Sequence, residues 1–236
     1  MLPDLRIALL VPMIGLLLTT LSPGPPFTPR HLSPYQMAKA RWLLEHRLSC
    51  LGCHELSGAG GRIGPSFGGL RTRRGPDAVY RMIADPQHTF PGTIMPREPI
   101  ADDTRALVTS YLLQLDAKPA AVPLVSRLPA PATQDSGAIV YARVCALCHG
   151  PSGAGDGPNA PYLPVRPTAH ADATAMSARS DASLYDAIAA GGAVADKSAR
   201  MPAFGETFTP AQIHGLVNHL RALCRCRGPA WSDDSR

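Results

Sequence analysis

The 236-residue sequence lacks the long alternating runs of β-branched residues that typify strands, which excludes a strand-rich fold. Proline and glycine, in contrast, are frequent at 25 and 21 residues. Many helix-breaking residues and little strand pattern together indicate short helices joined by long irregular connections. The composition therefore predicts an all-α protein, and its length allows two small domains but not three.

The sequence also lacks any dense block of positive charge. Its formal net charge is +5, but the lysines and arginines are scattered along the chain. Nucleic-acid-binding proteins concentrate such residues in a band or patch that follows the phosphate backbone. We therefore expect no nucleic-acid partner.

The N-terminus has an apolar run, Ile7 to Leu21, that follows Arg6. About fifteen apolar residues match the core of a signal peptide and are short for a membrane span. No small-x-small cleavage site follows, because prolines crowd residues 20–26, and Pro12 argues against a buried core helix. A removed signal peptide and an uncleaved membrane anchor both remain open. Either one exports the chain, so we expect a periplasmic or other extracytoplasmic location.

Local signals divide the rest of the chain into two similar halves. Ser33, Pro34 and Gln36 form a capping-box pattern that predicts a helix running into a first cysteine motif. Thr209 and Gln212 repeat this pattern before a final helix to about Leu223. Further helices are expected over 76–84, 102–115, from about 135 to a second cysteine motif, and over 180–190. The expected organisation is an N-terminal segment and Pro-rich spacer (1–32), a first domain (33–117), a Pro/Ala-rich linker (118–133), a second domain (134–226) and a tail (227–236).

The cysteine motifs are Cys50-Leu-Gly-Cys53-His54 and Cys145-Ala-Leu-Cys148-His149. Both read C-x-x-C-H, the attachment signature of c-type haem. Cysteines at this spacing can each form a thioether with one haem vinyl group, and the adjacent histidine can bind the iron. The sequence thus predicts two haem c groups, with His54 and His149 as iron ligands.

Other readings of the cysteine pairs fit less well. A zinc site would place two C-x-x-C pairs about fifteen to twenty residues apart, whereas these pairs are almost a hundred apart. A thioredoxin-like pair needs a βαβ setting, which the sequence lacks. Structural disulfides occur in exported proteins but would not require a histidine after both pairs.

Two methionines occupy matching places downstream of the motifs. Met95 and Met201 each precede a proline and lie shortly before the last helix of their half. A thioether sulfur is a soft sixth ligand that favours reduced iron. We expect Met95 and Met201 to complete the two iron sites. The competitors are Met176 and His170 for the second haem and His46 for the first.

These residues resemble the mitochondrial-type (class I) cytochrome c family, and the whole chain resembles two-domain dihaem cytochromes c. In the first half the resemblance rests on the cysteine motif and on the stretches 64–70 (GPSFGGL) and 91–96 (PGTIMP). It implies two tandem cytochrome c domains, each made of a few short helices around a covalently bound haem.

The resemblance also implies roles for further residues. The Pro65 carbonyl would accept a hydrogen bond from the His54 ring, and Arg73 or Arg74 would lie near a haem propionate. In the second half Pro161 or Pro167 would take the place of Pro65. Gly137 and Tyr141 match the family's crossing of first and last helices, where the first half has Trp42 and His46, so a wider or different crossing is expected there.

Cys224 and Cys226 lie outside the haem motifs. A disulfide between them, two free thiols, and a bond to another chain all remain open.

The resemblance implies electron transfer rather than catalysis, because six-coordinate iron leaves no position for a substrate. The expected function is electron transfer between redox partner proteins on the outer face of a membrane. One alternative is a cytochrome c subunit of a membrane-bound oxidoreductase or respiratory complex, which the N-terminal segment would anchor. A dihaem redox enzyme is a further alternative, and it would need one haem with a labile or absent sixth ligand.

Overall fold

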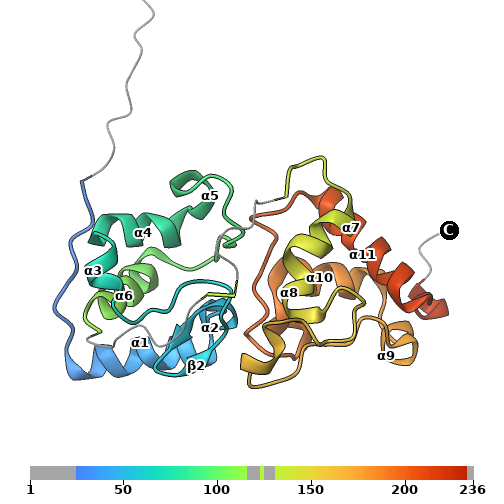
Figure 1. The fold of residues 1–236 in the computed structure, drawn as a ribbon, viewed down its shortest axis with the longest axis horizontal. Helices are drawn as coiled ribbons and strands as arrows, with labels where there is room; N and C mark the ends of the chain where they lie inside the picture. Colours follow the sequence, from blue (N-terminus) through green and yellow to red (C-terminus); the bar gives the residue numbers. More distant parts are fainter. Residues whose placement is uncertain (1–24, 116–122, 125–130, 233–236) are drawn as a thin grey trace, which may run out of the picture.

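The computed structural model describes residues 25–115, 123–124 and 131–232. Its elements are helices apart from one two-stranded hairpin, which confirms the predicted all-α fold. The helices form two halves that lie side by side (Figure 1). The expected N-terminal apolar run and most of the expected linker lie outside the described residues. None of the described helices has the length and apolar character that a membrane span requires.

The first half is built from short helices around the first cysteine motif. The hairpin follows that motif directly, with Glu55 opposite Gly60. The elements of this half are α1 (Pro34–His46), α2 (Cys50–Cys53), β1 (Glu55–Leu56), β2 (Ala59–Gly60), α3 (Leu70–Arg73), α4 (Pro76–Ala84), α5 (Pro86–Thr89) and α6 (Asp102–Leu113).

Helix α1 begins where the sequence predicts. The Ser33 hydroxyl accepts a hydrogen bond from the Gln36 backbone N–H, and the Gln36 side chain accepts one from the Ser33 N–H. This capping box satisfies two backbone donors that the first turn would otherwise leave unpaired. The helix does not continue into the cysteine motif as predicted. It ends at His46, and Cys50 starts a separate turn.

The contact between α1 and α6 is made by other residues than Trp42 and His46, the two positions that counting back from Cys50 selects. Trp42 is half-exposed, and His46 stacks on its ring at the surface. The fully buried residues of α1 are instead Ala40, two positions before Trp42, and Leu44, two positions before His46. The break between α1 and α2 shifts the register, so counting back from Cys50 selects the wrong face of the helix. The small Ala40 and the branched Leu44 join one core cluster with Val108, Tyr111 and Leu112 of α6.

The second half repeats the order with a continuous path into its motif. A π-helical turn, η1, links the first helix to the turn that carries the motif. The elements are α7 (Gly137–Val140), η1 (Tyr141–Cys145), α8 (Ala146–His149), η2 (Ala160–Tyr162), α9 (Ala173–Ser177), α10 (Asp181–Ala190), η3 (Gly192–Ala195), α11 (Pro210–Cys224) and η4 (Ala230–Ser232).

Helices α7 and α11 cross at two glycines. A Cβ atom added to Gly137 would lie 1.9 Å from the Gly215 carbonyl oxygen, so the backbones approach too closely for any side chain. Tyr141, one turn further along, is buried beneath this crossing. Gly137 and Tyr141 thus hold the positions that the resemblance implies. Thr209 and Gln212 cap α11 with the predicted box.

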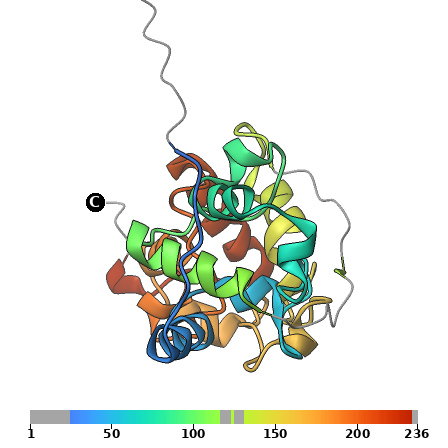
Figure 2. The same ribbon diagram turned by 90° about the vertical axis from the view of Figure 1, so that its left-hand side faces the viewer.

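The described end of the Pro-rich spacer packs against the first half and does not stand free. Phe27 stacks on Tyr80 of α4 with ring centroids 4.5 Å apart, and the Phe27 N–H donates to Asp77. Further along, the Leu32 N–H donates to Gln114 beyond the end of α6. Figure 2 shows this segment crossing the helices of the first half.

Candidate functional site

The first motif places two thiols and an imidazole at one cavity. Cys50 and Cys53 open and close the single turn α2, and His54 follows it. The His54 Nδ1 atom lies 2.7 Å from the Pro65 carbonyl oxygen. A carbonyl can only accept, so Nδ1 carries the proton and donates, and Nε2 is the nitrogen left for a metal. This is the arrangement that the resemblance implies for Pro65.

Close packing fixes the His54 ring further. Phe67 stacks on the imidazole with ring centroids 4.7 Å apart. A Cβ atom added to Gly64 would lie 2.3 Å from the ring, so this position requires glycine. Burial lowers the pKa of His54, which keeps the ring neutral and suited to binding a metal through nitrogen.

The second motif repeats this geometry with a different acceptor. The His149 Nδ1 atom donates to the Thr168 carbonyl oxygen over 2.9 Å. The prediction of Pro161 or Pro167 was therefore wrong, because the chain turns one residue later than the nearer proline. Burial also lowers the pKa of His149, so this ring too is neutral. Its tautomer again leaves Nε2 for a metal.

His170, a competitor for the sixth position at the second site, lies beside the motif histidine instead. Its ring stacks on the His149 ring with centroids 4.0 Å apart, and its Nδ1 atom is 3.1 Å from the Tyr141 hydroxyl. Burial is the main cause that lowers the pKa of His170 to about 2. The stacking places a neutral His170 alongside the His149 ring and not across the cavity from it.

The other two competitors differ in their surroundings. Met176 is completely buried in the core cluster of the second half and also lines the cavity. His46 is exposed at the end of α1, and its Nδ1 atom lies 3.0 Å from the Trp42 carbonyl oxygen.

Met95 and Met201 lie on loops whose backbones are fixed by hydrogen bonds. The Met95 carbonyl accepts from the Gln87 side chain over 2.6 Å. The Met201 carbonyl accepts from the Gly192 N–H over 3.0 Å. Both methionines line the same cavity as the motif histidines. Gln87 was not predicted, because one glutamine in a loop gives no sequence signal.

The structure distinguishes between the two arginines left open by the sequence. Arg73 donates to the backbone carbonyls of Gly68 and Gly69, so its guanidinium holds the loop after His54. Arg74 lines the cavity and is the one available to an anionic group there. Sequence reasoning missed four further cations on the cavity wall: Arg166, Arg179, Lys197 and Arg200.

One cavity of about 1390 Å³ touches both motifs. This volume exceeds the roughly 300–1,000 Å³ of a pocket for one small ligand. The cavity contacts all four motif cysteines, both motif histidines, and Met95 and Met201, with mostly apolar side chains between them. The four cysteines carry free thiols. Two thiols, one neutral imidazole and one thioether in each half fit a covalently held haem.

Glu98 is a partly buried carboxyl on the cavity wall that the sequence did not reveal. It follows Met95 by three residues and accepts a hydrogen bond from the Ser49 hydroxyl, just before the first motif. Burial raises its pKa to about 7, because water no longer solvates the charged form. Glu98 therefore changes its charge near neutral pH.

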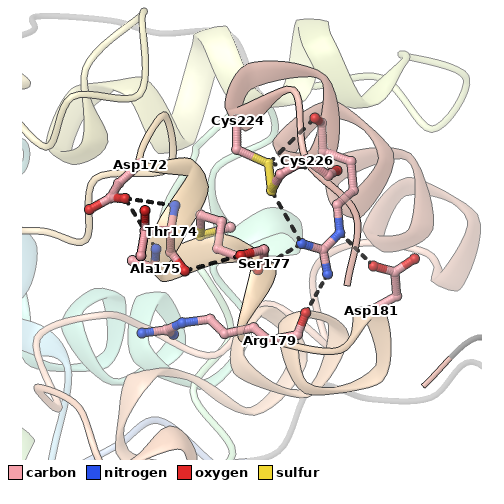
Figure 3. Close-up of a disulfide and its surroundings, with 10 residues drawn as sticks. Asp172, Thr174, Ala175, Ser177, Arg179, Asp181, Cys224 and Cys226 are labelled. Carbon is pink, nitrogen blue, oxygen red and sulfur yellow. Dashed lines mark hydrogen bonds and ion pairs between the residues drawn. A yellow bond between two sulfur atoms is a disulfide. The ribbon is translucent and has the colours of Figure 1, made fainter. Parts of the chain in front are cut away.

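The two remaining cysteines form a disulfide. Cys224 ends α11 and is bonded to Cys226 across Arg225, which adopts a left-handed conformation. Figure 3 shows the bond near Arg179 and Asp181. Arg221 donates to Asp181 and to the Arg179 carbonyl, which joins the end of α11 to the start of α10.

Comparison with known proteins gives one family match. Residues 132–220 match the family described as cytochrome C oxidase, cbb3-type, subunit III, a range that includes the second motif and Met201. A comparison with curated proteins finds no match. Among solved structures, the chain is similar to the reducing HAO-like protein complex of Kuenenia stuttgartiensis, at 17% identity over 83% of this chain and 98% of that one. Its TM-score of 0.31 is too low to carry an argument. The family match supports a c-type cytochrome with covalently bound haem c.

Proposed function

We propose that the chain is a dihaem c-type cytochrome that transfers electrons between redox partner proteins on the outer face of a membrane. The observation that carries this proposal is the repeated set of side chains around the cavity. Each half supplies two thiols, a histidine whose Nδ1 is held by a backbone carbonyl, and a methionine on a separate loop. Each haem, when bound, would supply an iron that alternates between its ferrous and ferric states.

The residues of the chain have distinct tasks in this proposal. Cys50, Cys53, Cys145 and Cys148 attach the two groups, and His54 and His149 bind metal through Nε2. The Pro65 and Thr168 carbonyls orient the two rings and increase their basicity. Met95 and Met201 would fill the sixth positions, which raises the potential and leaves no site for a substrate.

Removal of the cysteines one pair at a time tests the attachment. The chain is expressed with a host's c-type haem maturation system and examined by intact mass and by haem staining on a denaturing gel. We expect the mass of two haems in the parent, and of one in both Cys50→Ser/Cys53→Ser and Cys145→Ser/Cys148→Ser. Cys224→Ser/Cys226→Ser is the matched control and keeps both. A parent with the mass of the bare polypeptide would refute the proposal.

A carbon monoxide titration tests the sixth positions. Six-coordinate sites held by Met95 and Met201 should not bind carbon monoxide readily in the reduced protein. Met201→Ala should open the second site alone, and Met95→Ala the first. Ready binding by the parent would favour the redox-enzyme alternative.

A second candidate function is favoured by the family match. The family matched by residues 132–220 is named as a subunit of a cytochrome oxidase. The chain would then serve as the cytochrome c subunit of a membrane-bound oxidoreductase. Native purification separates the two functions: a carrier is isolated alone, and a subunit is isolated with its complex.

A further inference from the structure

The two cysteine motifs approach each other at a single asparagine. Asn159 belongs to the second half but is completely buried against the first. Its Nδ2 atom donates to the carbonyl oxygen of Gly52, within the first motif, over 2.8 Å. The same atom lies 3.3 Å from the Cys148 sulfur of the second motif. One amide nitrogen thus bridges both motifs.

The rest of Asn159 is equally constrained. Its Oδ1 atom accepts a hydrogen bond from the Arg62 N–H of the first half over 2.7 Å. Its backbone N–H donates to the Leu147 carbonyl, also in the second motif, over 2.9 Å. The side chain therefore uses both N–H donors and its oxygen acceptor. A flipped amide, with Oδ1 and Nδ2 exchanged, would not satisfy these neighbours.

Glycines let the backbones of the two halves meet around this residue. A Cβ atom added to Gly52 would lie 2.0 Å from the Arg200 carbonyl oxygen. One added to Gly61 would lie 2.2 Å from the Gly52 oxygen and 2.9 Å from Asn159 Nδ2. Backbone atoms cannot move aside as a flexible side chain can, so a larger residue at Gly52 would push the halves apart, and one at Gly61 would displace the Gly52 carbonyl and the Asn159 amide.

Two arginines add further interactions between the halves near Asn159. The Arg62 guanidinium lies over the Tyr162 ring, 4.1 Å from its centroid. Arg200 donates to the Leu44 and Glu45 carbonyls at the end of α1, over 3.0 and 2.9 Å. The contact between the two halves therefore consists of several separate interactions. Among the residues named here, Asn159 is the one whose side chain contacts both cysteine motifs.

We propose that Asn159 is a positioning residue that locks the two motifs together, so that the two haems form one rigid pair and exchange electrons within the molecule. This inference rests on the proposed function. In each exchange one iron is oxidised by one electron and the other is reduced by one, so no bond forms and no co-reactant is needed. Because electron tunnelling slows steeply with distance, a fixed separation fixes the rate.

The experiment compares three substitutions in the haem-loaded full chain. Asn159→Leu keeps the size and removes every side-chain hydrogen bond. Asn159→Asp keeps the acceptor for Arg62 and removes both donors. Asn218→Leu is the matched control, because Asn218 is an exposed asparagine on α11. Three quantities are measured: haem content by mass, magnetic coupling between the two oxidised irons by electron paramagnetic resonance, and the rate of internal electron equilibration after flash reduction.

We expect the parent and Asn218→Leu to show coupling and fast equilibration. Both Asn159 substitutions should keep two haems, weaken the coupling and slow equilibration at least tenfold. Should Asn159→Leu fail to fold, Gly52→Ala tests the same contact from the other side and should give the same two losses.

Two results would count against the inference, and a third would count against the proposed function on which it rests. A purely structural asparagine would lower the melting temperature of the Asn159 variants without changing coupling or rate. A parent with two haems but no coupling would overturn the inference and leave the proposed function intact. A parent without haem would instead be a failure of the proposed function.

Discussion

At the scale of single residues, the two motif histidines show how a loop fixes the tautomer of an imidazole. His54 and His149 are both followed by a chain turn that returns a carbonyl to Nδ1, from Pro65 in one half and Thr168 in the other. The stacking partner differs, being the apolar ring of Phe67 in the first half and the hydrogen-bonded ring of His170 in the second. Polar groups near a metal ligand tune its potential. The two sites are therefore chemically distinct although their motifs are alike.

Glu98 makes the stability of the protein depend on pH. Its folded-state pKa of about 7 exceeds the 4.5 of an exposed glutamate, so the folded state holds the proton more tightly. This contribution to stability is complete below about pH 4.5 and is lost as the pH rises through 7. We expect Glu98→Gln to unfold at a higher temperature than the parent at pH 8 and to differ less from it at pH 5.

Thermal unfolding at the two pH values measures this effect. Glu206→Gln is the control, because the Glu206 side chain is 55% exposed. The explanation fails if Glu98→Gln and Glu206→Gln have the same dependence on pH.

At the scale of elements, most helix bounds could be predicted, including the ends of α4 at Ala84 and of α10 at Ala190, but the break within the first helical stretch could not. Ser33 and Thr209 combine a capping side chain, a following proline and a glutamine at the third helical position, a local pattern with one common outcome. The break after His46 and the π-helical turn at Tyr141 have no such pattern. Single turns such as α3 and α5 are too short to be stable by propensity alone, and tertiary contacts hold them.

The crossing of α7 and α11 depends on Gly137. Since an added Cβ would lie 1.9 Å from the Gly215 oxygen, Gly137→Ala must push the helices apart. We expect a loss of about 1–3 kcal/mol in the free energy of unfolding, typical of an overpacked core. Urea unfolding measures this loss. Gly75→Ala, at a glycine with nothing within 4 Å of its added Cβ, is the control and should lose less stability than Gly137→Ala, because it only replaces the N-cap of α4 by a poorer capping residue.

The disulfide at the end of α11 should contribute only modestly to stability. It joins residues separated by 2 positions, so it restricts the unfolded chain little. We expect Cys224→Ser/Cys226→Ser to lose roughly 1–2 kcal/mol, the contribution of such a short loop. Urea unfolding of this double variant measures the loss. A loss of 4 kcal/mol or more (about the contribution of a long loop) would show that the bond does more than close this turn.

At the scale of the whole molecule, the sequence predicts the repeat but not the contact between its halves. Both motifs and both capping boxes are local patterns, readable without knowledge of the neighbours. Asn159, in contrast, is one polar residue in a glycine-rich loop, and Arg62 lies almost a hundred residues away from it. Their meeting depends on how two folded units dock, which no periodicity or spacing records. For the same reason a cavity shared by both motifs could not be anticipated from two separate patterns.

Docking of the halves predicts that they unfold together. Each half has its own core cluster, but Asn159 and Arg200 tie the second to the first. We expect one calorimetric transition in the haem-loaded protein, with equal calorimetric and van't Hoff enthalpies.

Arg200→Gln removes charged donors from two carbonyls of α1, which should cost about 1–3 kcal/mol and split the transition in two. Arg47→Gln is the control, because Arg47 is an exposed arginine at the same end of α1. Two separate transitions in the parent would mean that these bonds do not couple the halves.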